Sequence, residues 1–378
     1  MNPEIVQRFA DLADLIKAHS AEAESAGKLS RPVVQALLEA GIARLYLPAS
    51  LGGLEADPLT VAAVTSSLAH SDTAAAWFVM VANASRLMAQ YWSADLVEEL
   101  WKDDPDLIIA ASGNKPFTAT PVAGGVLVDG VNSFVSGCHH ASLLLSPVHL
   151  DGAMAMALVP MAECSIEDNW RSLGMRGTGS NDVAAEKVFV PDTHVIPMLD
   201  PPSERNHHYQ SALYLCPSRI LFATYVPVTL VLAERALAEL SDLAEGKTAY
   251  ADDRKLKHRS IAQIKYGKGL ATYRASREYF YSALDDAWCR AQQGVGANAQ
   301  QKADLYLAGT HAAQSSAQVV RWVADAAGTS VIYSDNPLER IFRDMETLRH
   351  HGFVSESRYG SVTQVLWDAT LDYQLLLR

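Results

Sequence analysis

Three stretches of the chain, far apart in sequence, carry side chains that can act on a bound ligand. Ser136 ends an alternating apolar run, Trp170 to Pro191 is rich in glycine and hydroxyl side chains, and His350 and His351 lie near the C-terminus. Imidazole titrates near neutral pH and therefore serves as an acid or a base. Hydroxyl and backbone N–H groups between glycines can hydrogen-bond an anion or a planar heterocycle, because glycine lets backbone approach a ligand closely.

The glycine-rich stretch, WRSLGMRGTGSNDVAAEKVFVP, supports two interpretations by itself. Thr178 and Ser180 lie between glycines and can contact a ligand, but a glycine-rich hairpin without any ligand explains the same letters. Ser136 is likewise either a hydroxyl at a site or a serine that ends a strand at a turn. His350 and His351 compete for any role in proton transfer. Short glycine motifs have a high false-positive rate, so other parts of the chain must decide.

The composition indicates a soluble, acidic protein with more than one folded unit. The chain has 378 residues, 49% of them hydrophobic and 20% charged, and a formal net charge of −12. Single cores stop growing near roughly 250–300 residues, and the negative charge argues against nucleic acid or an anionic membrane as a partner. The longest uncharged apolar run, Ile220 to Ala233, is shorter than the ~18–20 residues of a membrane span. The N-terminus lacks the pattern of a signal peptide.

The cysteines and histidines indicate neither a disulfide framework nor a metal site. The four cysteines are widely spaced, which is typical of reduced thiols and predicts a cytoplasmic location. The neighbouring histidine pairs lack the spacing, with an intervening glutamate, of a helical zinc site, so we expect no metal. The chain also lacks a GxGxxG after a strand and a GxSxG turn, which disfavours a nicotinamide-binding Rossmann unit and a hydrolase.

The elements that must position these residues change character twice along the chain. Residues 1–105 show helical spacing, and residues 106–200 change to short alternating runs, which predict a barrel or a sandwich. Residues 201–378 return to long helices that form a bundle, after a polar connecting loop over 198–212 that we expect to be mobile. The fold class is therefore α+β, mostly α. The expected bundle helices are Leu221–Leu243, Ser260–Arg290, Gln300–Ala327 and Glu356–Leu377.

This three-part order, together with WRSLGMRGTGSNDVAAEKVFVP, resembles the acyl-CoA dehydrogenase superfamily over nearly the whole chain. LYLPASLGGLEADPLT and HSDTAAAW look like signatures of its first domain. GGVLVDGVNSFVSGCHHA looks like its strand against the flavin, and AGTSVIYSDNPLERIFRDMETLRHHG resembles its segment with an Arg-Asp pair. The resemblance implies an N-terminal helical domain (1–105), a central β-barrel domain (106–200) and a C-terminal four-helix bundle (201–378).

Two chemistries occur within that superfamily, and the presence or absence of a catalytic glutamate distinguishes them. The dehydrogenases remove an α-proton from an acyl-CoA with a glutamate, which lies in one of two places. The first place corresponds here to His351 and Gly352, and the second to Pro217-Ser218-Arg219. Glycine and arginine cannot abstract such a proton near neutral pH. An FAD-dependent acyl-CoA dehydrogenase or oxidase therefore remains only as an alternative with a base elsewhere, beside a non-catalytic flavin-binding or ligand-binding member of the fold.

The other branch resembles the oxygenase component of two-component flavin monooxygenases, such as the hydroxyphenylacetate hydroxylases and dibenzothiophene monooxygenase. These proteins take reduced FMN or FAD from a separate NAD(P)H:flavin reductase. Molecular oxygen then gives a flavin C4a-hydroperoxide, which transfers one oxygen atom to a small aromatic or heteroatom-bearing substrate. Ser136 in FVSG and His351 after the Arg-Asp pair match this branch. A further histidine of the branch is absent, since the matching helix reads ANASRLMA.

The resemblance implies roles for seven residues and a homotetramer whose subunits complete one another's flavin sites. His351 and Ser136 are the expected catalytic residues. We expect Arg343 and Asp344 to form a structural ion pair, and Trp77 to belong to the core. The expected flavin-binding residues are Phe134, Trp170, Thr178, Ser180 and Arg254, the last reaching a neighbouring subunit's flavin phosphates. Lys255, Lys257 and Arg259 compete with Arg254 for this role, and a solvated basic cluster explains the same residues.

Overall fold

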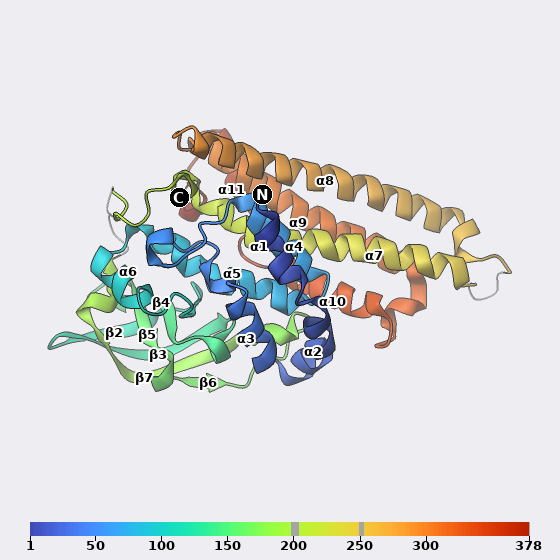
Figure 1. Ribbon diagram of the computed structural model, residues 1–378. Helices are drawn as coiled ribbons and strands as arrows, with labels where there is room; N and C mark the ends of the chain where they lie inside the picture. The colour runs from blue at the N-terminus through green and yellow to red at the C-terminus, as the bar shows by residue number, and fades with distance from the viewer. Residues whose placement is uncertain (198–203, 249–252, 378) are drawn as a thin grey trace.

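The computed structural model describes residues 1–197, 204–248 and 253–377. Residues 198–203 of the connecting loop predicted over 198–212 therefore lie outside the described residues. The chain forms N-terminal helices, a central sheet and C-terminal helices, in the order predicted. The N-terminal helices, blue in Figure 1, lie between the sheet and the long helices of the C-terminal part.

The N-terminal helices begin where the sequence provides side-chain caps. The Asp57 carboxylate accepts a hydrogen bond from the Thr60 N–H, and the Asp72 carboxylate accepts from Ala74 and Ala75. These contacts satisfy N–H groups that have no partner inside the helix. The helix after Asp72 is buried along most of its length, as predicted. The helices are α1 (Pro3–Ala10), α2 (Ala13–Ala26), α3 (Arg31–Glu39), α4 (Pro58–Ala69), α5 (Thr73–Met88) and α6 (Ala94–Trp101).

The central part is a curled sheet of eight strands around its own apolar core. Hydrogen-bonded neighbours follow the order β6-β7-β3-β2-β4-β5-β8, and β1 pairs in parallel with β4. Strands β5 and β7, which are not neighbours in this order, also pack against each other. The strands are β1 (Ile109–Ala111), β2 (Phe117–Val122), β3 (Gly125–Val135), β4 (Leu143–Leu150), β5 (Ala153–Pro160), β6 (Ser165–Glu167), β7 (Asn181–Pro191) and β8 (Val195–Pro197).

One strand pairing brings two of the candidate stretches together. Strands β3 and β7 are antiparallel, and their register places Val135 opposite Asn181. The residue after β3, Ser136, therefore lies beside the residue before β7, Ser180. The register shifts between Asn132 and Val135, and Phe134 there adopts a left-handed backbone with φ of 60°. Such a bulge re-aims side chains locally.

The C-terminal helices are α7 (Val226–Gly246), α8 (Ser260–Gln292), α9 (Ala299–Ala327), α10 (Pro337–Leu348) and α11 (Ser357–Leu366). The long helices α7 and α8 both pack against α9, as in a bundle. The fourth predicted helix is shorter than expected, because α11 ends at Leu366 and Asp368 turns the chain with φ of 53°. The chain then folds back, and the Ser361 hydroxyl donates to the Asp372 carboxylate at 2.7 Å.

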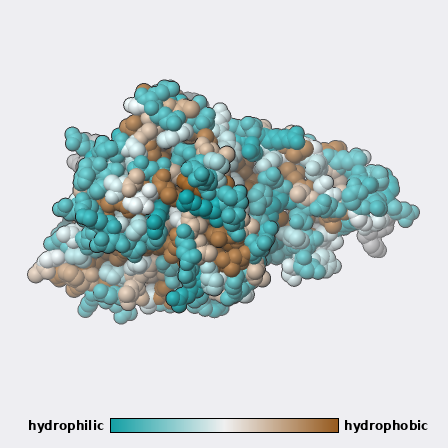
Figure 2. Space-filling view, viewed as in Figure 1, coloured by the Kyte–Doolittle hydropathy of each residue, from teal (hydrophilic) through white to brown (hydrophobic). Residues whose placement is uncertain are grey.

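The most apolar helical segment belongs to the interior of the bundle. Residues 218–246 are long and apolar enough to cross a membrane, but 83% of their most apolar window is buried in the protein. The segment starts as a 3-10 helix over Ser218–Thr224 and continues as α7, with Pro227 in the first turn. Figure 2 shows a face that is mostly hydrophilic, with apolar residues in separate patches. The segment is therefore best explained as a core helix.

Candidate active site

A large cavity lies where the three parts of the chain meet. Its volume is about 2280 Å³, larger than the roughly 300–1,000 Å³ of a typical ligand pocket, so it has room for a cofactor and a substrate together. The walls come from α5, from the end of β3, from the glycine-rich loop, from the 3-10 helix before α7 and from the segment after α10. Six of the seven predicted site residues line it: Phe134, Ser136, Trp170, Thr178, Ser180 and His351.

Three hydroxyl groups form a chain that ends at the cavity. Thr178 Oγ1 donates to the carbonyl oxygen of Met175 at 2.8 Å, and its oxygen lies 2.7 Å from Ser180 Oγ. Ser180 Oγ is in turn 2.7 Å from Ser136 Oγ. Each hydroxyl has a single proton, and a carbonyl only accepts, so Ser180 donates to Thr178 and Ser136 donates to Ser180. The free lone pairs of Ser136 make it an acceptor toward the cavity.

Hydrogen bonds between side chains and backbone around Asn181 hold the glycine-rich loop against the sheet. The Asn181 side-chain oxygen accepts from the Trp170 N–H at 2.9 Å, and the indole N–H of Trp170 donates to Met175 O at 3.0 Å. The Phe134 ring meets Trp170 edge-to-face, with 5.9 Å between ring centres. Phe134 is 60% exposed on the left-handed bulge of β3. The two rings therefore form an aromatic wall at the cavity, where a planar ligand can stack.

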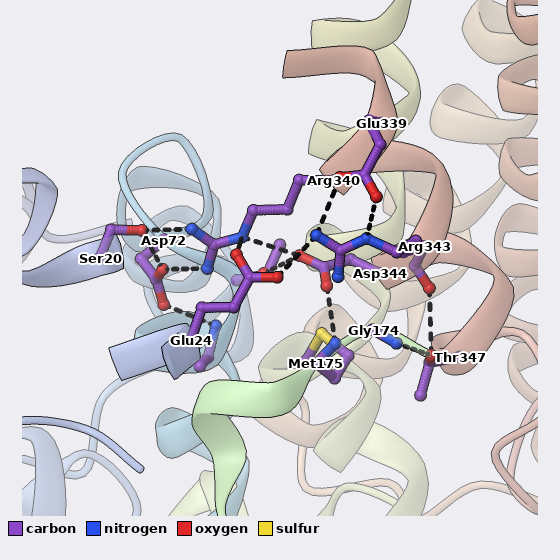
Figure 3. A network of polar contacts seen from close by, with 12 residues as sticks. Ser20, Glu24, Asp72, Gly174, Met175, Glu339, Arg340, Arg343, Asp344 and Thr347 are labelled. Atoms are coloured by element: carbon purple, nitrogen blue, oxygen red, sulfur yellow. Dashed lines mark hydrogen bonds and ion pairs between the residues drawn. The ribbon is translucent and has the colours of Figure 1, made fainter. Parts of the chain in front are cut away.

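Helix α10 is docked directly onto the glycine-rich loop (Figure 3). The Met175 N–H donates to the Asp344 carboxylate at 2.6 Å, and the Gly174 N–H donates to Thr347 Oγ1 at 2.9 Å. A Cβ on Gly174 would lie 2.2 Å from the carbonyl oxygen of Arg343, so only glycine allows this approach. The segment that follows α10 carries His351. The loop that lines one wall of the cavity therefore also fixes the helix that delivers the histidine.

The expected ion pair between Arg343 and Asp344 is wrong. Arg343 binds Glu24 at 2.6 Å and Glu339 at 2.5 Å, while the buried Asp344 carboxylate faces Arg340 at 3.7 Å. Consecutive residues on an α-helix point about 100° apart, so the two side chains leave α10 in different directions. Arg340 also binds Asp72, the N-cap of α5 (Figure 3). The Arg-Asp pair thus ties α10 to the N-terminal helices as well as to the glycine-rich loop.

His351 is held among aromatic rings in its neutral form. Its ring centre lies 5.2 Å from that of Trp77, 5.4 Å from Tyr225 and 4.9 Å from Phe353. Burial, and then the charge of Arg219, lower its pKa to about 4. The Phe353 N–H donates to Nδ1 at 3.3 Å, so in the neutral ring Nε2 carries the proton. At neutral pH the side chain is therefore a hydrogen-bond donor through Nε2 and not an imidazolium acid.

The low pKa values of buried histidines predict a loss of stability in mild acid. Burial, with smaller effects of nearby charges, lowers the pKa of His351 and of His140 to about 4. The unfolded chain binds a proton at each below about pH 6.5, so stability falls as pH drops from there toward 4. We expect each histidine to remove about 2 kcal/mol between pH 7 and pH 5.

Urea unfolding of the His140→Gln variant at pH 7 and pH 5 measures this contribution. The difference in unfolding free energy between the two pH values should be smaller than in the wild type by about 2 kcal/mol, which is the contribution of one histidine. His350→Gln, at an exposed position, should leave the difference at its wild-type value. A His140→Gln variant with the full wild-type difference would show that His140 titrates normally in the folded protein.

Three cavity residues were not among the predicted site residues. Trp77 is only 6% exposed, as expected of a core residue, yet it also lines the cavity. Arg219 and Phe353 line it too, although the sequence marks Arg219 only as a position without a catalytic glutamate, and Phe353 directly follows the segment that ends RHHG. They meet His351 only because separate helices converge there. Arg254 is exposed in the turn between α7 and α8 and does not line the cavity of its own chain, so its role toward a neighbouring subunit stays a prediction.

One cluster away from the cavity has side chains of the kind that bind metals. The ligand atoms of Glu98, His207 and His208 lie within 4.8 Å of one another. His208 already hydrogen-bonds Ser50 at 2.8 Å and Glu98 at 3.2 Å, so its ring nitrogens have partners without an ion. The expectation that the protein holds no metal stays a prediction.

Comparisons with known proteins agree with this architecture. The N-terminal domain model of the acyl-CoA dehydrogenases matches residues 4–99, and the C-terminal domain model matches residues 223–356. Indole-3-acetate monooxygenase of Pseudomonas putida is 28% identical, covering 91% of this chain and 88% of its own length. The flavin-dependent monooxygenase oxygenase subunit HsaA of Rhodococcus jostii is 24% identical, over 92% of this chain and 93% of its own.

A solved structure shares the fold over almost the full length. XiaF from Streptomyces sp., in complex with FADH2 and glycerol, superposes with a TM-score of 0.89 at 20% identity, covering 98% of this chain and 96% of that one. At that identity the likeness concerns the fold. The sequence relatives and the two domain models together identify the family. The chain belongs to the acyl-CoA dehydrogenase superfamily and is similar there to the oxygenase components of flavin-dependent monooxygenases.

Proposed function

We propose that this protein is the oxygenase component of a two-component flavin monooxygenase that oxygenates a small aromatic or heteroatom-bearing substrate. One observation carries the proposal: both positions that hold a catalytic glutamate in the dehydrogenases face the cavity without a carboxylate. They are occupied by Gly352 beside the neutral His351, and by Arg219. Of the acids that line the cavity among the described residues, Glu346 is bound by Arg321 and Arg349. Asp182 in β7 and Asp192 directly after it occupy neither of the two glutamate positions. This arrangement favours oxygen transfer over α-proton abstraction.

The cavity residues fit a reduced flavin. A reduced flavin ring presents an N–H at N5, and Ser136, whose own proton is directed to Ser180, is a matching acceptor. Phe134 and Trp170 offer aromatic surface to the planar ring, and Thr178 holds the far end of the hydroxyl chain. When bound, reduced FMN or FAD supplies the two electrons by which molecular oxygen gives one oxygen atom to the substrate and one to water.

The protein's own residues orient the bound molecules, supply a proton donor and exclude water from the cavity. His351 Nε2–H would donate a hydrogen bond to the reacting oxygen or to a hydroxyl of a bound substrate, and the neutral ring keeps this donor at all pH values well above 4. Trp77, Tyr225 and Phe353 surround the imidazole and exclude water. Exclusion of water strengthens each polar contact inside the cavity and limits wasteful release of hydrogen peroxide.

The proposal includes partners and an assembly. Reduced flavin comes from a separate NAD(P)H:flavin reductase, in line with relatives that are named as oxygenase subunits or components. We assign the protein to the cytoplasm and to a homotetramer, in which the exposed Arg254 contacts the flavin phosphates of a neighbouring subunit. Sedimentation analysis tests the assembly, and flavin affinity of an Arg254→Gln variant tests the contact.

Stopped-flow oxidation of protein-bound reduced flavin, with FMN and FAD in separate runs, tests the reaction. The bound flavin should return to its oxidised spectrum in more than one kinetic phase, and ¹⁸O₂ should label an aromatic product. Reoxidation in a single fast phase with no labelled product would count against the proposal. Tightly held oxidised FAD that is bleached by an acyl-CoA would establish the dehydrogenase instead.

The hydroxyl chain makes a further prediction about Ser136 and Ser180. Ser136→Ala removes the acceptor and should raise the share of reduced flavin lost as hydrogen peroxide, with product yield about tenfold lower, the loss expected of one hydrogen bond to a reacting group. Ser180→Ala frees the Ser136 proton to rotate and should give a smaller loss of the same kind. Peroxide yield per flavin consumed measures both. Equal, wild-type yields in the two variants would remove Ser136 from the mechanism.

A further inference from the structure

Glu98, His207 and His208 form a cluster outside the cavity, where two separate parts of the chain meet. Glu98 lies in α6, whereas His208 lies 110 residues further along, in the segment over 204–209. None of these three residues lines the cavity. Zinc motifs on a helix bring their ligands together by local spacing, but here the fold brings the glutamate to the histidines. Local spacing in the sequence therefore gives no sign of the cluster.

The three possible ligand atoms converge on a small volume. His208 Nε2 lies 3.2 Å from Glu98 Oε1, His207 Nε2 lies 3.9 Å from the same oxygen, and all three atoms lie within 4.8 Å of one another. Around a tetrahedral zinc ion with bonds of about 2.0–2.1 Å, ligand atoms are about 3.3–3.4 Å apart. Glu98 and His208 already have nearly this separation. The His207 side chain is 68% exposed, so it can rotate to close the remaining gap.

The contacts behind the ligands suit a metal ion as well as a proton. Ser50 Oγ lies 2.8 Å from His208 Nδ1. Without an ion, Nε2–H of His208 donates to Glu98 and Nδ1 accepts from the hydroxyl. When a cation binds Nε2, Nδ1–H donates to the same hydroxyl, which can act in either sense. Lys102 Nζ donates to Glu98 Oε2 at 3.3 Å and leaves Oε1 toward the histidines. Outer hydrogen bonds of this kind orient metal ligands.

The segment over 204–209 forms part of the cavity wall, although its histidines face away from the cavity lining. The Asn206 N–H donates to the Gln90 carbonyl at 3.0 Å, and the Asn206 amide donates to the carbonyls of Ala89 and Trp92. Arg205, Gln90 and Trp92 all line the cavity. A cation shared by Glu98 and the two histidines would add a link between this segment and α6.

We propose that Glu98, His207 and His208 bind a divalent transition-metal ion, Zn²⁺ above all, with water as the remaining ligand. Imidazole and carboxylate suit Zn²⁺, whereas Mg²⁺ and Ca²⁺ prefer sites made of oxygen atoms alone. The ion has a structural role, which is to fasten the segment over 204–209 to α6. The proposal departs from the expectation of no metal, which rested on the spacing of histidines in the sequence. It is independent of the reaction in the cavity.

Calorimetric titration of the flavin-free protein with ZnCl₂ tests the site, after removal of any polyhistidine tag. The wild type should bind one ion per chain with a Kd of about 10 µM or lower, and Mg²⁺ should not compete. His207→Ala and Glu98→Gln should each weaken binding by about tenfold or more. His19→Ala is the matched control, because His19 pairs with Glu22 at 2.7 Å as two ligands only, and it should bind like the wild type. Absence of binding by the wild type, or wild-type affinity in either ligand variant, overturns the proposal.

Two further measurements separate this cluster from other zinc ligands. Cys289 is an exposed thiol, and a thiolate also binds zinc. Co²⁺ in place of Zn²⁺ should give a spectrum without the strong charge-transfer band of a cobalt–thiolate bond, and such a band retained in His207→Ala would place the ion at a cysteine and overturn the assignment.

Thermal unfolding measures the link between the two segments. Saturating Zn²⁺ should raise the Tm of the wild type by several degrees, because it binds the folded state. His207→Ala should have the wild-type Tm without zinc, since its side chain is exposed, and should show no rise with zinc. A Tm of the wild type that does not respond to zinc would overturn the structural role.

Discussion

Gly174→Ala is expected to destabilise the protein by about 3 kcal/mol or more, because the added methyl group has no space. The new Cβ would lie 2.2 Å from the carbonyl oxygen and 2.3 Å from the carbonyl carbon of Arg343, and these are backbone atoms of α10 that cannot rotate away. Either the loop or the helix must shift. A shift breaks the hydrogen bonds from Gly174 to Thr347 and from Met175 to Asp344 (Figure 3).

The loss should reach the active site as well as the fold, since the loop and the segment after α10 both line the cavity. Urea unfolding and flavin affinity measure the two effects. Gly267→Ala is the matched control: Gly267 lies inside α8, no atom lies within 4 Å of its added Cβ, and alanine there should stabilise by about 0.5–1 kcal/mol. Wild-type stability and flavin affinity in Gly174→Ala would show that the loop and α10 are not docked as described.

His351→Ala is expected to lower the rate of substrate oxygenation by about 10²–10⁴, the usual contribution of a positioned proton donor. Reduced flavin should still be consumed, with more of it lost as hydrogen peroxide. His351→Gln keeps an N–H donor of similar reach and should recover part of the activity. His350→Ala, one residue earlier and exposed, is the control and should retain nearly full activity. If His350→Ala lost activity and His351→Ala retained it, the proton donor would be His350.

The pH profile distinguishes a neutral donor from an imidazolium acid. Because the pKa of His351 is lowered to about 4, the neutral form is present throughout the range from pH 5 to pH 8. Activity that depends on this group should be level there and fall only on the acid side, as the ring becomes protonated near pH 4. Measurement of product formation from pH 4 to pH 8 tests this. A transition near pH 6.5 that disappears in His351→Ala would show that the imidazolium form is used.

Much of the fold and the family could be predicted from local patterns. The aspartates at positions 57 and 72 begin helices because a carboxylate can satisfy the free N–H groups of a first turn within three residues. The change from helical to alternating spacing near residue 107 marks the sheet, since side chains alternate across a strand. The same patterns failed near the C-terminus, where the predicted helix over Glu356–Leu377 ends at Leu366. The apolar residues that follow do not form a buried helical face, and Trp367 is 79% exposed.

What the sequence by itself determined was the identity of the residues that can act: the hydroxyl of Ser136, the imidazole of His351 and the glycines of the loop. Only the tertiary structure decided what state they are in. The direction of the hydroxyl chain depends on the Met175 carbonyl, and the neutral form of His351 depends on its burial among Trp77 and Tyr225. These are properties of contacts between residues far apart in the chain, and a local pattern carries no record of such contacts.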